Sequence, residues 1–531
     1  MIKRYYVGLD VSTQGTKLVL LDYASKRPLF VTVVNYDKDL QEYNTENGVI
    51  KGRPEGVSES DPKMWIKAVD IVFERLKNSG HDSACVRAIS VSGQQHGLVS
   101  LDAEGNLTRK TSKLWNDVST VAECAEITEK CGGKAALIAS TWNVLKPGYT
   151  AGKILHFKKE DPDGFRRTTT FFLVHNYINW YLTGGKKGGV RAMEPGDASG
   201  VALMNPENKQ WAVRVCNAID PQLIAKLLPV KPADEFIGTI SKELSARYGF
   251  PADCRIDAGS GDNMYGAVGT GNVRPGLVTL SLGTSGTACT LFNSVYRDSE
   301  GEIASFCDSF GQYMALLCVS NLANGYNKIV QSLNITHEEF SRLITKTAPG
   351  NGGRVLIPWY TGERTPDMPS GAPVYFGFGL DDFTPERLSR AVLEGHVMNL
   401  YEGFCRLQTK ADALFLTGGI AQSPAWRQCI ADIFGRTVVP VKGEGAALGA
   451  AVHAAYVDNK TDVGADGVYG FVRPFIEYDE ANRTAPNPAV AEKYESFKRI
   501  YLALSARARG VAGAGDPFAL RRSFVEAYGT E

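Results

Sequence analysis

The sequence predicts an α/β protein with at least two domains, and three observations lead to that prediction. The chain has 531 residues, which is more than one hydrophobic core usually organises. Short runs rich in Val, Leu and Ile alternate with longer stretches of helical periodicity, as strands alternate with helices in α/β proteins. Two strand–turn–strand segments of the same design, one in each half of the chain, suggest an internal duplication.

Composition excludes several classes of partner. Lys plus Arg and Asp plus Glu both number 58, so the chain has no overall basic field to attract nucleic acid or anionic lipid. Apolar residues make up 44% and charged residues 22%, which is typical of a globular protein in water. No apolar run approaches the roughly 18 residues of a membrane-spanning helix. We therefore expect small-molecule partners, no nucleic acid and no membrane, with the protein acting as a monomer or homodimer.

The cysteines and the first residues indicate the compartment. The ten cysteines are scattered and form no C-x-x-C pair, which argues against a disulfide framework or a cysteine-based metal site. The opening MIKRYYVGLDVST leads directly into a strand pattern, without the apolar core and cleavage site of a signal peptide. We therefore expect a cytoplasmic location.

The first strand–turn–strand segment covers residues 5–22, YYVGLDVSTQGTKLVLLD. Asp10 ends its first strand, and the turn contains Thr13 and Gln14. Small turn residues present backbone N–H groups and hydroxyls without bulk, which suits phosphate oxygens, and Lys17 adds a positive charge. A plain surface hairpin explains the same residues, because Asp, Gly and Thr are ordinary turn residues.

The next elements lead to a polar turn. Residues 37–62 are polar and rich in Gly, Asn and Glu, and predict an extended loop. Asp61-Pro62 begins a helix to about Leu76, and residues 86–91 predict a buried strand. That strand runs into Gln94-Gln95-His96 between two glycines. Two amides and an imidazole could bind the hydroxyls of a carbohydrate, although an ordinary turn histidine is an equally good interpretation.

The middle of the first half is mainly helical. Residues 119–158 predict helices interrupted at Pro147-Gly148. Gly148–Lys153 resembles a phosphate-binding P-loop, but its glycines are one residue too close and Ile154 replaces the required Ser or Thr, so that motif is rejected. Residues 171–181 predict a further helix, and residues 194–203, EPGDASGVAL, predict a loop before a short strand.

The second half begins with a glycine-rich turn, RIDAGSGDNMYGAVGT, over residues 255–270. Asp262 begins the helix that follows, where a carboxylate commonly caps the free backbone N–H groups. The same carboxylate could instead lie at a ligand site, since the glycines beside it allow a substrate to approach the backbone. Residues 276–292, GLVTLSLGTSGTACTLF, then repeat the hairpin design, with Thr284 in the turn.

The remaining elements complete the α/β pattern. Thr384-Pro385 begins a helix to about Leu407, and residues 413–416 predict a buried strand. Gly418-Gly419 follow this strand and precede a helix over 423–434, a combination that lets a ring or phosphate lie against backbone. A strand over 438–441, a helix over 446–456 and a C-terminal helix come next. In that last helix, Tyr494, Phe497, Tyr501 and Leu504 have helical spacing and predict packing on the second domain.

Seven motifs in order carry a resemblance to a known family: DVSTQGTK, GQQHG, GSGDN, LSLGTSGT, GERTP, FGFGL…RAVLEG and LTGGIAQSP. Together they resemble the FGGY carbohydrate kinases, which include glycerol, gluconate, ribulose and xylulose kinases. The resemblance covers roughly residues 5 to 505. Within the family, the SGQQHG and SLGTSG segments are most similar to the xylulose kinases.

The resemblance implies an α/β fold of two actin-like (ribonuclease H-like) domains with an interdomain cleft. We expect an N-terminal domain over residues 1–253 on the sugar side and a C-terminal domain over 254–480 on the nucleotide side, followed by a helical extension over 481–531. It also implies ATP-dependent phosphorylation of a ketopentose, D-xylulose to D-xylulose 5-phosphate, with Mg²⁺ and ATP.

The resemblance also assigns roles to single residues. Asp262 matches the catalytic base, and Asp10 matches the residue that positions Mg²⁺. The sugar contacts are expected at Gln95, His96, Asp262 and Asn263. The nucleotide contacts are expected at Thr13, Gln14, Lys17, Thr284, Asn327, Gly418, Gly419 and Gln422.

One departure from the family and two other functions qualify this assignment. Many relatives carry Arg two residues after the aspartate of the W-N/Q-D motif, whereas here Asn116-Asp117 is followed by Val118-Ser119. Ribulose, gluconate and glycerol therefore stay open as alternative substrates.

An actin- or chaperone-like ATPase would use the same fold, but the GQQHG turn has no role in it. A sugar-binding module without catalysis would have lost its base, whereas Asp262 is present.

Overall fold

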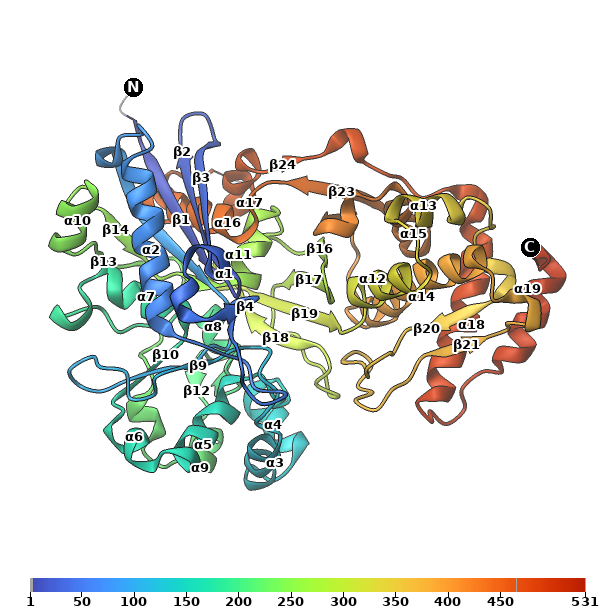
Figure 1. The fold of residues 1–531 in the computed structure, drawn as a ribbon, viewed down its shortest axis with the longest axis horizontal. Helices are drawn as coiled ribbons and strands as arrows, with labels where there is room; N and C mark the ends of the chain where they lie inside the picture. Colours follow the sequence, from blue (N-terminus) through green and yellow to red (C-terminus); the bar gives the residue numbers. More distant parts are fainter. Residues whose placement is uncertain (1–2, 465, 531) are drawn as a thin grey trace. The chain divides into compact units, whose positions relative to one another are not determined.

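The computed structural model describes residues 3–464 and 466–530, and the chain forms two compact units (Figure 1). Unit 1 comprises Met1–Arg274, Leu291–Met314 and Gly443–Glu477. Unit 2 comprises Pro275–Thr290, Ala315–Lys442 and Tyr478–Glu531. The units therefore alternate along the chain. Among the described residues, no helix is long and apolar enough to cross a membrane.

A mixed sheet forms the centre of unit 1. Its strands follow the order β13-β14-β7-β1-β2-β3, and the short β15 also pairs with β7. The predicted hairpin of residues 5–22 is confirmed as β1 and β2, which pair antiparallel with Asp10 opposite Lys17. β7 lies parallel to β1 on its other side. The strand bounds are β1 Tyr5–Val11, β2 Gly15–Asp22, β3 Arg27–Asn35, β7 Val86–Gly93, β13 Phe236–Thr239, β14 Arg255–Asp257 and β15 Ser260–Gly261.

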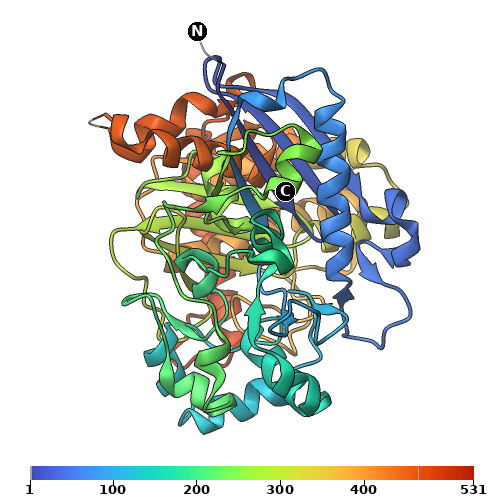
Figure 2. The same cartoon turned by 90° about the vertical axis from the view of Figure 1, so that its left-hand side faces the viewer.

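Both faces of this sheet are covered by helices (Figures 1 and 2), which explains why β1 reads as an almost continuous apolar run. One set of alternate side chains, including Val7 and Leu9, joins a core with Trp65 and Phe73 of α2 (Pro62–Lys77). Gly8 has the opposite orientation, and a Cβ there would lie 1.9 Å from the carbonyl oxygen of Ala447 on α16 (Gly445–Asn459). Only glycine allows this approach of helix to strand.

The predicted helix after Asp61 is confirmed as α2. The Asp61 side chain accepts a hydrogen bond from the backbone N–H of Lys63, and Pro62 occupies the first helical turn, so the helix begins as its sequence predicts. The predicted helices over 119–158 are confirmed as α3 (Val121–Lys130), α4 (Lys134–Thr141) and α5 (Thr150–Glu160).

Three local predictions were wrong in part. Residues 170–172 form the strand β10, and the helix α7 begins only at Val174 (Val174–Leu182). Residues 194–203 were predicted as a loop, but Glu194 accepts hydrogen bonds from two backbone N–H groups and caps the short helix α8 (Pro195–Ser199). Residues 37–62 contain short elements ordered by Asp37, whose carboxylate accepts from Thr45, Asn47 and Gly48.

The remaining elements of unit 1 lie outside its central sheet. They are α1 Tyr36–Asp39, η1 Gln41–Tyr43, β4 Thr45–Glu46, β5 Val49–Ile50, β6 Glu59–Ser60, η2 Ser83–Cys85, β8 Val99–Leu101, β9 Ser112–Lys113, β10 Thr170–Phe172, α6 Pro162–Arg167, η3 Gly185–Lys187, β11 Met204–Asn205, β12 Gln210–Trp211, α9 Val213–Ile219, η4 Leu223–Lys226, α10 Lys242–Tyr248, α11 Asp262–Gly269, β18 Ala304–Cys307, η8 Lys460–Asp462, α17 Gly467–Val472 and η9 Arg473–Phe475.

Unit 2 repeats the central topology of unit 1. β16 pairs antiparallel with β17 on one side and parallel with β22 on the other, and the central order is β19-β17-β16-β22-β23. This order matches β3-β2-β1-β7-β14 strand for strand, as a duplication predicts. The bounds are β16 Leu277–Leu282, β17 Gly286–Phe292, β19 Tyr313–Val319, β22 Ala413–Thr417 and β23 Thr437–Lys442.

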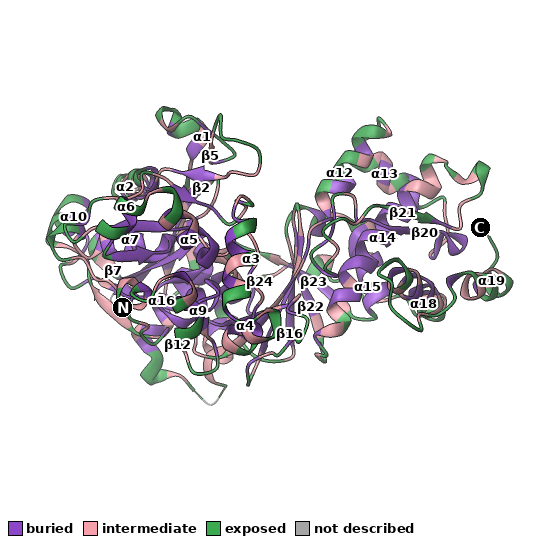
Figure 3. Cartoon of the chain, turned by 90° about the horizontal axis from the view of Figure 1, so that it is seen from below, coloured by how far each residue is buried: buried purple, intermediate pink, exposed green. Residues whose placement is uncertain are grey.

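Two helices of unit 2, α14 and α15 (Pro424–Phe434), follow their predicted limits closely. Thr384 caps α14 (Pro385–Arg406), which Figure 3 shows largely buried. The C-terminal α18 (Ala491–Ala508) packs within unit 2, where the Tyr494 hydroxyl donates to the Glu394 carboxylate on α14 at 2.9 Å. The other elements are α12 Ala323–Ser332, α13 His337–Ile344, η5 Asn351–Gly353, β20 Val355–Ile357, β21 Val374–Phe376, η6 Leu380–Asp382, η7 Gly419–Gln422, α15 Pro424–Phe434, β24 Glu477–Tyr478, η10 Glu480–Asn482, η11 Pro488–Val490 and α19 Pro517–Tyr528.

Candidate active site

Three strands of unit 1 end side by side and bring the predicted base, metal and sugar residues together. β1 carries Asp10 near its end, β7 leads into Gln94, and β15 leads into Asp262. β1 and β15 both lie parallel to β7, so their carboxyl ends meet at one edge of the sheet. Ligand sites of α/β proteins form at such edges.

Asp262 is the first residue of α11, and Gly261 is its N-cap. The expectation that Asp262 itself caps the helix was therefore wrong, because its backbone is already helical. Its carboxylate accepts hydrogen bonds from the backbone N–H of Asn263 at 2.9 Å and from the Asn263 side chain at 3.2 Å. Burial, followed by the negative charges of Asp10 and Asp197, raises the pKa of Asp262 to about 8.

Asp10 is the second carboxylate of this edge. Its Oδ1 accepts a hydrogen bond from the Ser92 hydroxyl at 2.9 Å. Burial raises the pKa of Asp10 to about 6, although the Ser92 hydrogen bond and the charge of Lys17 act in the opposite direction. Two neighbouring carboxylates with raised pKa values form a site that a cation would stabilise.

These carboxylates suit Mg²⁺ brought in with a nucleotide. Within residues 3–464 and 466–530, no group of three or more His, Cys, Asp or Glu residues could hold a metal by itself. Mg²⁺ commonly keeps several waters and binds through one or two carboxylates plus substrate phosphates. Asp10, with Asp262 as a second negative charge, fits that mode of binding.

Two of the predicted sugar residues, Gln95 and Asn263, form a continuous chain of hydrogen bonds with the predicted base. The Asn263 side chain donates to the side-chain oxygen Oε1 of Gln95 at 2.7 Å as well as to Asp262. The Gln95 amide nitrogen lies 3.5 Å from Asp197 Oδ1, and Asp197 Oδ2 lies 2.8 Å from His175 Nδ1. The site therefore orients the Gln95 amide from both ends.

Asp197 and His175 were missed by sequence reasoning. Both are fully buried, and Asp197 lies in EPGDASG, a segment whose composition predicts a loop. A carboxylate between small residues directly before an apolar run was the signal available. Gly261 also contributes, since a Cβ there would lie 2.8 Å from Gln95 Cγ, so the GSGD glycine makes room for the amide.

His96 adopts a left-handed backbone conformation, with φ of 67°. Its imidazole ring lies 4.7 Å from the Tyr149 ring between centroids. Its carbonyl oxygen accepts hydrogen bonds from two residues at the start of α5, Thr150 and Lys153. The turn that carries Gln95 and His96 is therefore held by α5 as well as by β7.

The turn between β1 and β2 is tied to the sugar turn. The Thr13 hydroxyl donates to the Gln94 side chain at 3.1 Å and accepts from the Trp115 indole N–H at 3.0 Å. Gln14 is exposed. Lys17 forms an ion pair with Glu444 at 2.9 Å, a partner that sequence reasoning did not foresee. Trp115 is thus the residue of the W-N-D motif that contacts this turn.

The remaining predicted nucleotide residues belong to unit 2, where they surround a cavity of about 660 Å³. The β16–β17 turn supplies Thr284, α12 supplies Asn327, and η7 supplies Gly419 and Gln422. Gly418 lies directly before η7, at the end of β22, and is outside the cavity lining. Aromatic residues complete the wall, with the Tyr326 hydroxyl 2.7 Å from His337 Nδ1 and the Trp426 ring beside Tyr326.

A second cavity, of about 680 Å³, lies in unit 1 and is lined by none of the predicted site residues. Tyr177 and Trp180 of α7 stack in its wall, with ring centroids 5.5 Å apart. Its lining comes from α2, α7, the turn 184–187, the loop 105–110 and the start of α10, whereas the predicted sugar and metal residues lie at the ends of β1, β7 and β15.

Comparison with known proteins identifies the family. The N-terminal domain model of the FGGY family of carbohydrate kinases matches residues 5–269, and its C-terminal domain model matches residues 278–457. These matches cover most of the chain, so the chain belongs to the FGGY family of carbohydrate kinases. The family resemblance and the two-domain α/β fold predicted from the motifs are confirmed, and the protein is a carbohydrate kinase.

Several individual proteins are similar to this chain over most of its length. The xylulose kinase of Haemophilus influenzae is 34% identical over 509 residues, covering 94% of this chain and 98% of that protein. The xylulose kinase of Streptomyces coelicolor is 32% identical over 490 residues, covering 90% and 93%. The structure of ligand-bound xylulose kinase from Lactobacillus acidophilus matches with a TM-score of 0.84 at 23% identity, covering 96% and 99%. Gluconate kinase from the same organism also scores 0.84, at 22% identity, covering 97% and 99%.

Proposed function

We propose that this kinase transfers the γ-phosphoryl group of ATP to the terminal O5 hydroxyl of D-xylulose, giving D-xylulose 5-phosphate. The observation that carries this proposal is the hydrogen-bonded chain from Asp262 through Asn263 to Gln95. This hydrogen-bonded chain links a carboxylate that can accept a proton with an amide that can hydrogen-bond to a sugar. The curated relatives named xylulose kinase support the choice of substrate.

Asp262 would act as the general base. A pKa near the operating pH makes a carboxylate an effective proton acceptor, and burial beside other carboxylates raises that of Asp262 to about 8. In the reaction, Asp262 takes the proton of the attacking hydroxyl as its oxygen bonds to phosphorus. The bond from the γ-phosphorus to the bridging oxygen of ADP breaks, and ADP leaves. Little covalent chemistry is asked of the protein beyond this proton and the positioning of both substrates.

The sugar would be held by Gln95, His96 and Asn263. Their amides and imidazole offer both donors and acceptors, which match a ketone flanked by hydroxyls. The adenosine part of ATP would occupy the cavity lined by Asn327, Gly419 and Gln422, with Thr284, Thr13 and Gln14 directed to its phosphates and Gly418 beside the adenosine. Lys17 would add a positive charge near Asp10, although the negative charge of its ion-pair partner Glu444 offsets part of it.

Mg²⁺ would be held by Asp10 together with the phosphates of the nucleotide. When bound, it neutralises phosphate charge that would otherwise repel Asp10 and Asp262. We expect the reaction to take place in the cytoplasm, with the protein as a monomer or homodimer.

A second candidate substrate is gluconate, because a gluconate kinase has an equally similar fold. The site disfavours it, since a carboxylate substrate would meet the negative charges of Asp10, Asp197 and Asp262. Ribulose and glycerol are further alternatives. Glycerol lacks the ketone and has fewer hydroxyls than D-xylulose, so the polar groups left without a ligand would weaken its binding.

The test is kcat/KM for D-xylulose, D-ribulose, L-ribulose, gluconate and glycerol, with ATP consumption followed in each case. We expect the highest value for D-xylulose and little ATP consumption without sugar. A preference for gluconate or glycerol would overturn the substrate. ATP turnover that is independent of every sugar would instead favour an actin- or chaperone-like ATPase.

A further inference from the structure

The side chain of Lys153 is fully buried in unit 1, on the first turn of α5. Its ammonium group donates to the backbone carbonyl oxygen of His96 at 2.7 Å. A buried ammonium is costly unless it is paired or hydrogen-bonded, and its partner here is the main chain of the predicted sugar turn. Lys153 belongs to the glycine-containing segment 148–153 that fails as a P-loop, and no sequence motif predicts a role for it.

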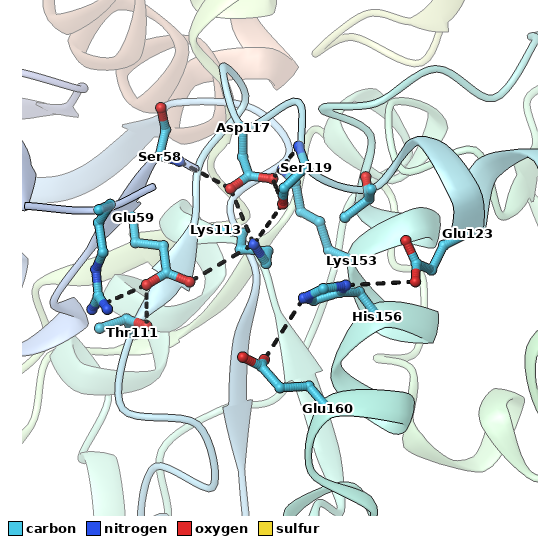
Figure 4. A network of polar contacts seen from close by, with 12 residues as sticks. Ser58, Glu59, Thr111, Lys113, Asp117, Ser119, Glu123, Lys153, His156 and Glu160 are labelled. Atoms are coloured by element: carbon cyan, nitrogen blue, oxygen red, sulfur yellow. Dashed lines mark hydrogen bonds and ion pairs between the residues drawn. The ribbon is translucent and has the colours of Figure 1, made fainter. Parts of the chain in front are cut away.

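Burial lowers the pKa of Lys153 to about 7, although the negative charge of Asp117 favours its ammonium form. The Asp117 carboxylate is itself hydrogen-bonded to other groups. Asp117 accepts hydrogen bonds from the Lys113 ammonium at 3.1 Å and from the Ser119 hydroxyl and backbone N–H. Figure 4 shows this network beside Lys153, with Glu59 and Ser58 on its other side. Asp117 is thus already bound to another lysine, and the carbonyl of His96 is the group to which the Lys153 ammonium is hydrogen-bonded.

The carbonyl that Lys153 binds belongs to a residue with unusual backbone geometry. His96 has a φ of 67°, which is uncommon for a residue with a side chain and needs support from its surroundings. Thr150, one turn earlier on α5, donates to the same oxygen at 3.3 Å. Residues three apart lie on the same face of a helix, so a single face of α5 supplies both donors.

The same helix start also contacts the imidazole. Tyr149 is the residue before α5, and its ring lies 4.7 Å from that of His96. On the other side of the turn, Gln95 is fixed by Asn263 at 2.7 Å. The turn is therefore held at the His96 main chain by α5 and at the Gln95 side chain by α11, which begins with Asp262.

We propose that Lys153 is a positioning residue for sugar binding, which holds the His96 peptide in its left-handed conformation and so directs the Gln95 and His96 side chains to the substrate. This inference rests on the proposed sugar-binding role of Gln95 and His96. Lys153 has no exposed surface, so it acts through the turn and does not touch the sugar.

The experiment compares Lys153→Met, Thr150→Val and His96→Ala by steady-state kinetics, with KM measured separately for D-xylulose and ATP. Methionine keeps the length of the lysine side chain and removes the donor. Loss of a hydrogen bond from a charged donor typically corresponds to about a tenfold to hundredfold effect. We expect Lys153→Met to raise KM for D-xylulose by about that factor, with KM for ATP nearly unchanged, and Thr150→Val to have a smaller effect in the same direction.

Lys158→Met is the matched control. Lys158 is also on α5 and also donates to a backbone carbonyl, that of Ile219 at 2.8 Å, but that carbonyl belongs to α9 and not to the sugar turn. We expect its substitution to leave both KM values unchanged. Circular dichroism and the thermal midpoint of every variant identify loss of folding, and Lys153→Arg tests whether another cationic donor restores the KM for sugar.

The outcomes separate this inference from the proposed function. If His96→Ala raises KM for D-xylulose while folded Lys153→Met and Thr150→Val leave it unchanged, Lys153 has no positioning role and the sugar site stands. If His96→Ala leaves the sugar kinetics unchanged, the assignment of the turn to the sugar site is itself wrong. Should Lys153→Met fail to fold, an unchanged sugar KM in folded Thr150→Val would still contradict the inference, because Thr150 donates to the same carbonyl oxygen.

Discussion

The side-chain amide of Asn263 donates to the side-chain oxygen Oε1 of Gln95 at 2.7 Å and to Asp262 Oδ1 at 3.2 Å. Asn263 thus links the carboxylate proposed as the base to the amide proposed to bind the sugar. The two groups come from residues 167 positions apart in the chain. Gln95 follows β7, and Asp262 follows β15. Their proximity depends on β15 pairing parallel with β7.

Asp262→Asn should abolish phosphoryl transfer and leave both substrates able to bind. Asparagine has nearly the same shape as aspartate but cannot accept the proton of the attacking hydroxyl. Loss of a general base typically reduces the rate by about 10²–10⁴-fold. The measurement is kcat, together with calorimetric binding of D-xylulose and of an ATP analogue. Turnover near that of the wild type would show that Asp262 is not the base.

Asp197→Asn should shift the acid limb of the kcat/KM profile to lower pH. Asp262 must be ionised to accept a proton, so activity should rise as pH increases through its pKa. The negative charge of Asp197 helps to raise that pKa, after burial and the charge of Asp10, and removing the charge should lower it. The measurement is kcat/KM for D-xylulose from pH 5 to 9. An acid limb that moves to higher pH would contradict the assigned electrostatic role of Asp197.

Much of the fold followed from local signals in the sequence. The apolar run of β1, the cap Asp61 and the cap Thr384 each act over a few residues, and the structure confirms the elements that they predicted. The recurrence of the hairpin was also visible, and the matching strand order of the two sheets agrees with it.

The supporting contacts of the site could not be predicted in the same way. Asp197, His175 and Lys153 act through partners far away in the sequence, and burial gives them their roles. EPGDASG looks like a loop because small and acidic residues favour turns, and only the folded chain shows that Glu194 caps a helix and that Asp197 contacts Gln95. Likewise, Trp115 reaches Thr13 from 102 residues away.

Asp10→Asn should raise the concentration of Mg²⁺ needed for activity. Asparagine keeps an oxygen that can accept the Ser92 hydrogen bond but lacks the charge that a hard divalent cation prefers. The measurement is activity against free Mg²⁺ at fixed ATP, with Lys186→Met as a control because Lys186 is exposed and lies in the α7–η3 region, on the lining of the other cavity. Full wild-type activity in excess chelator would rule out the metal requirement, and an unchanged Mg²⁺ dependence in Asp10→Asn would rule out the role of Asp10.

Asp262→Asn should also stabilise the ligand-free protein, increasingly so as pH rises. Burial and the charges of Asp10 and Asp197 raise the pKa of Asp262 from 3.8 to about 8. The folded state therefore binds this proton more tightly than the unfolded state, so the contribution of Asp262 to stability falls as pH rises between these two values. Asparagine carries no charge, so the variant does not lose stability in this way as pH rises.

The difference in stability between Asp262→Asn and the wild type should thus grow from about pH 4 and become constant above about pH 8. The measurement is the urea midpoint of unfolding for both proteins at pH 5, 6, 7 and 8.5. Asp22→Asn serves as the control, because Asp22 accepts hydrogen bonds from two backbone N–H groups in a turn and its pKa is lowered, so its loss should destabilise the protein at neutral pH. If Asp262→Asn were less stable than the wild type at pH 8.5, the ionised Asp262 carboxylate would stabilise the folded protein. That result would contradict a pKa of Asp262 raised by burial.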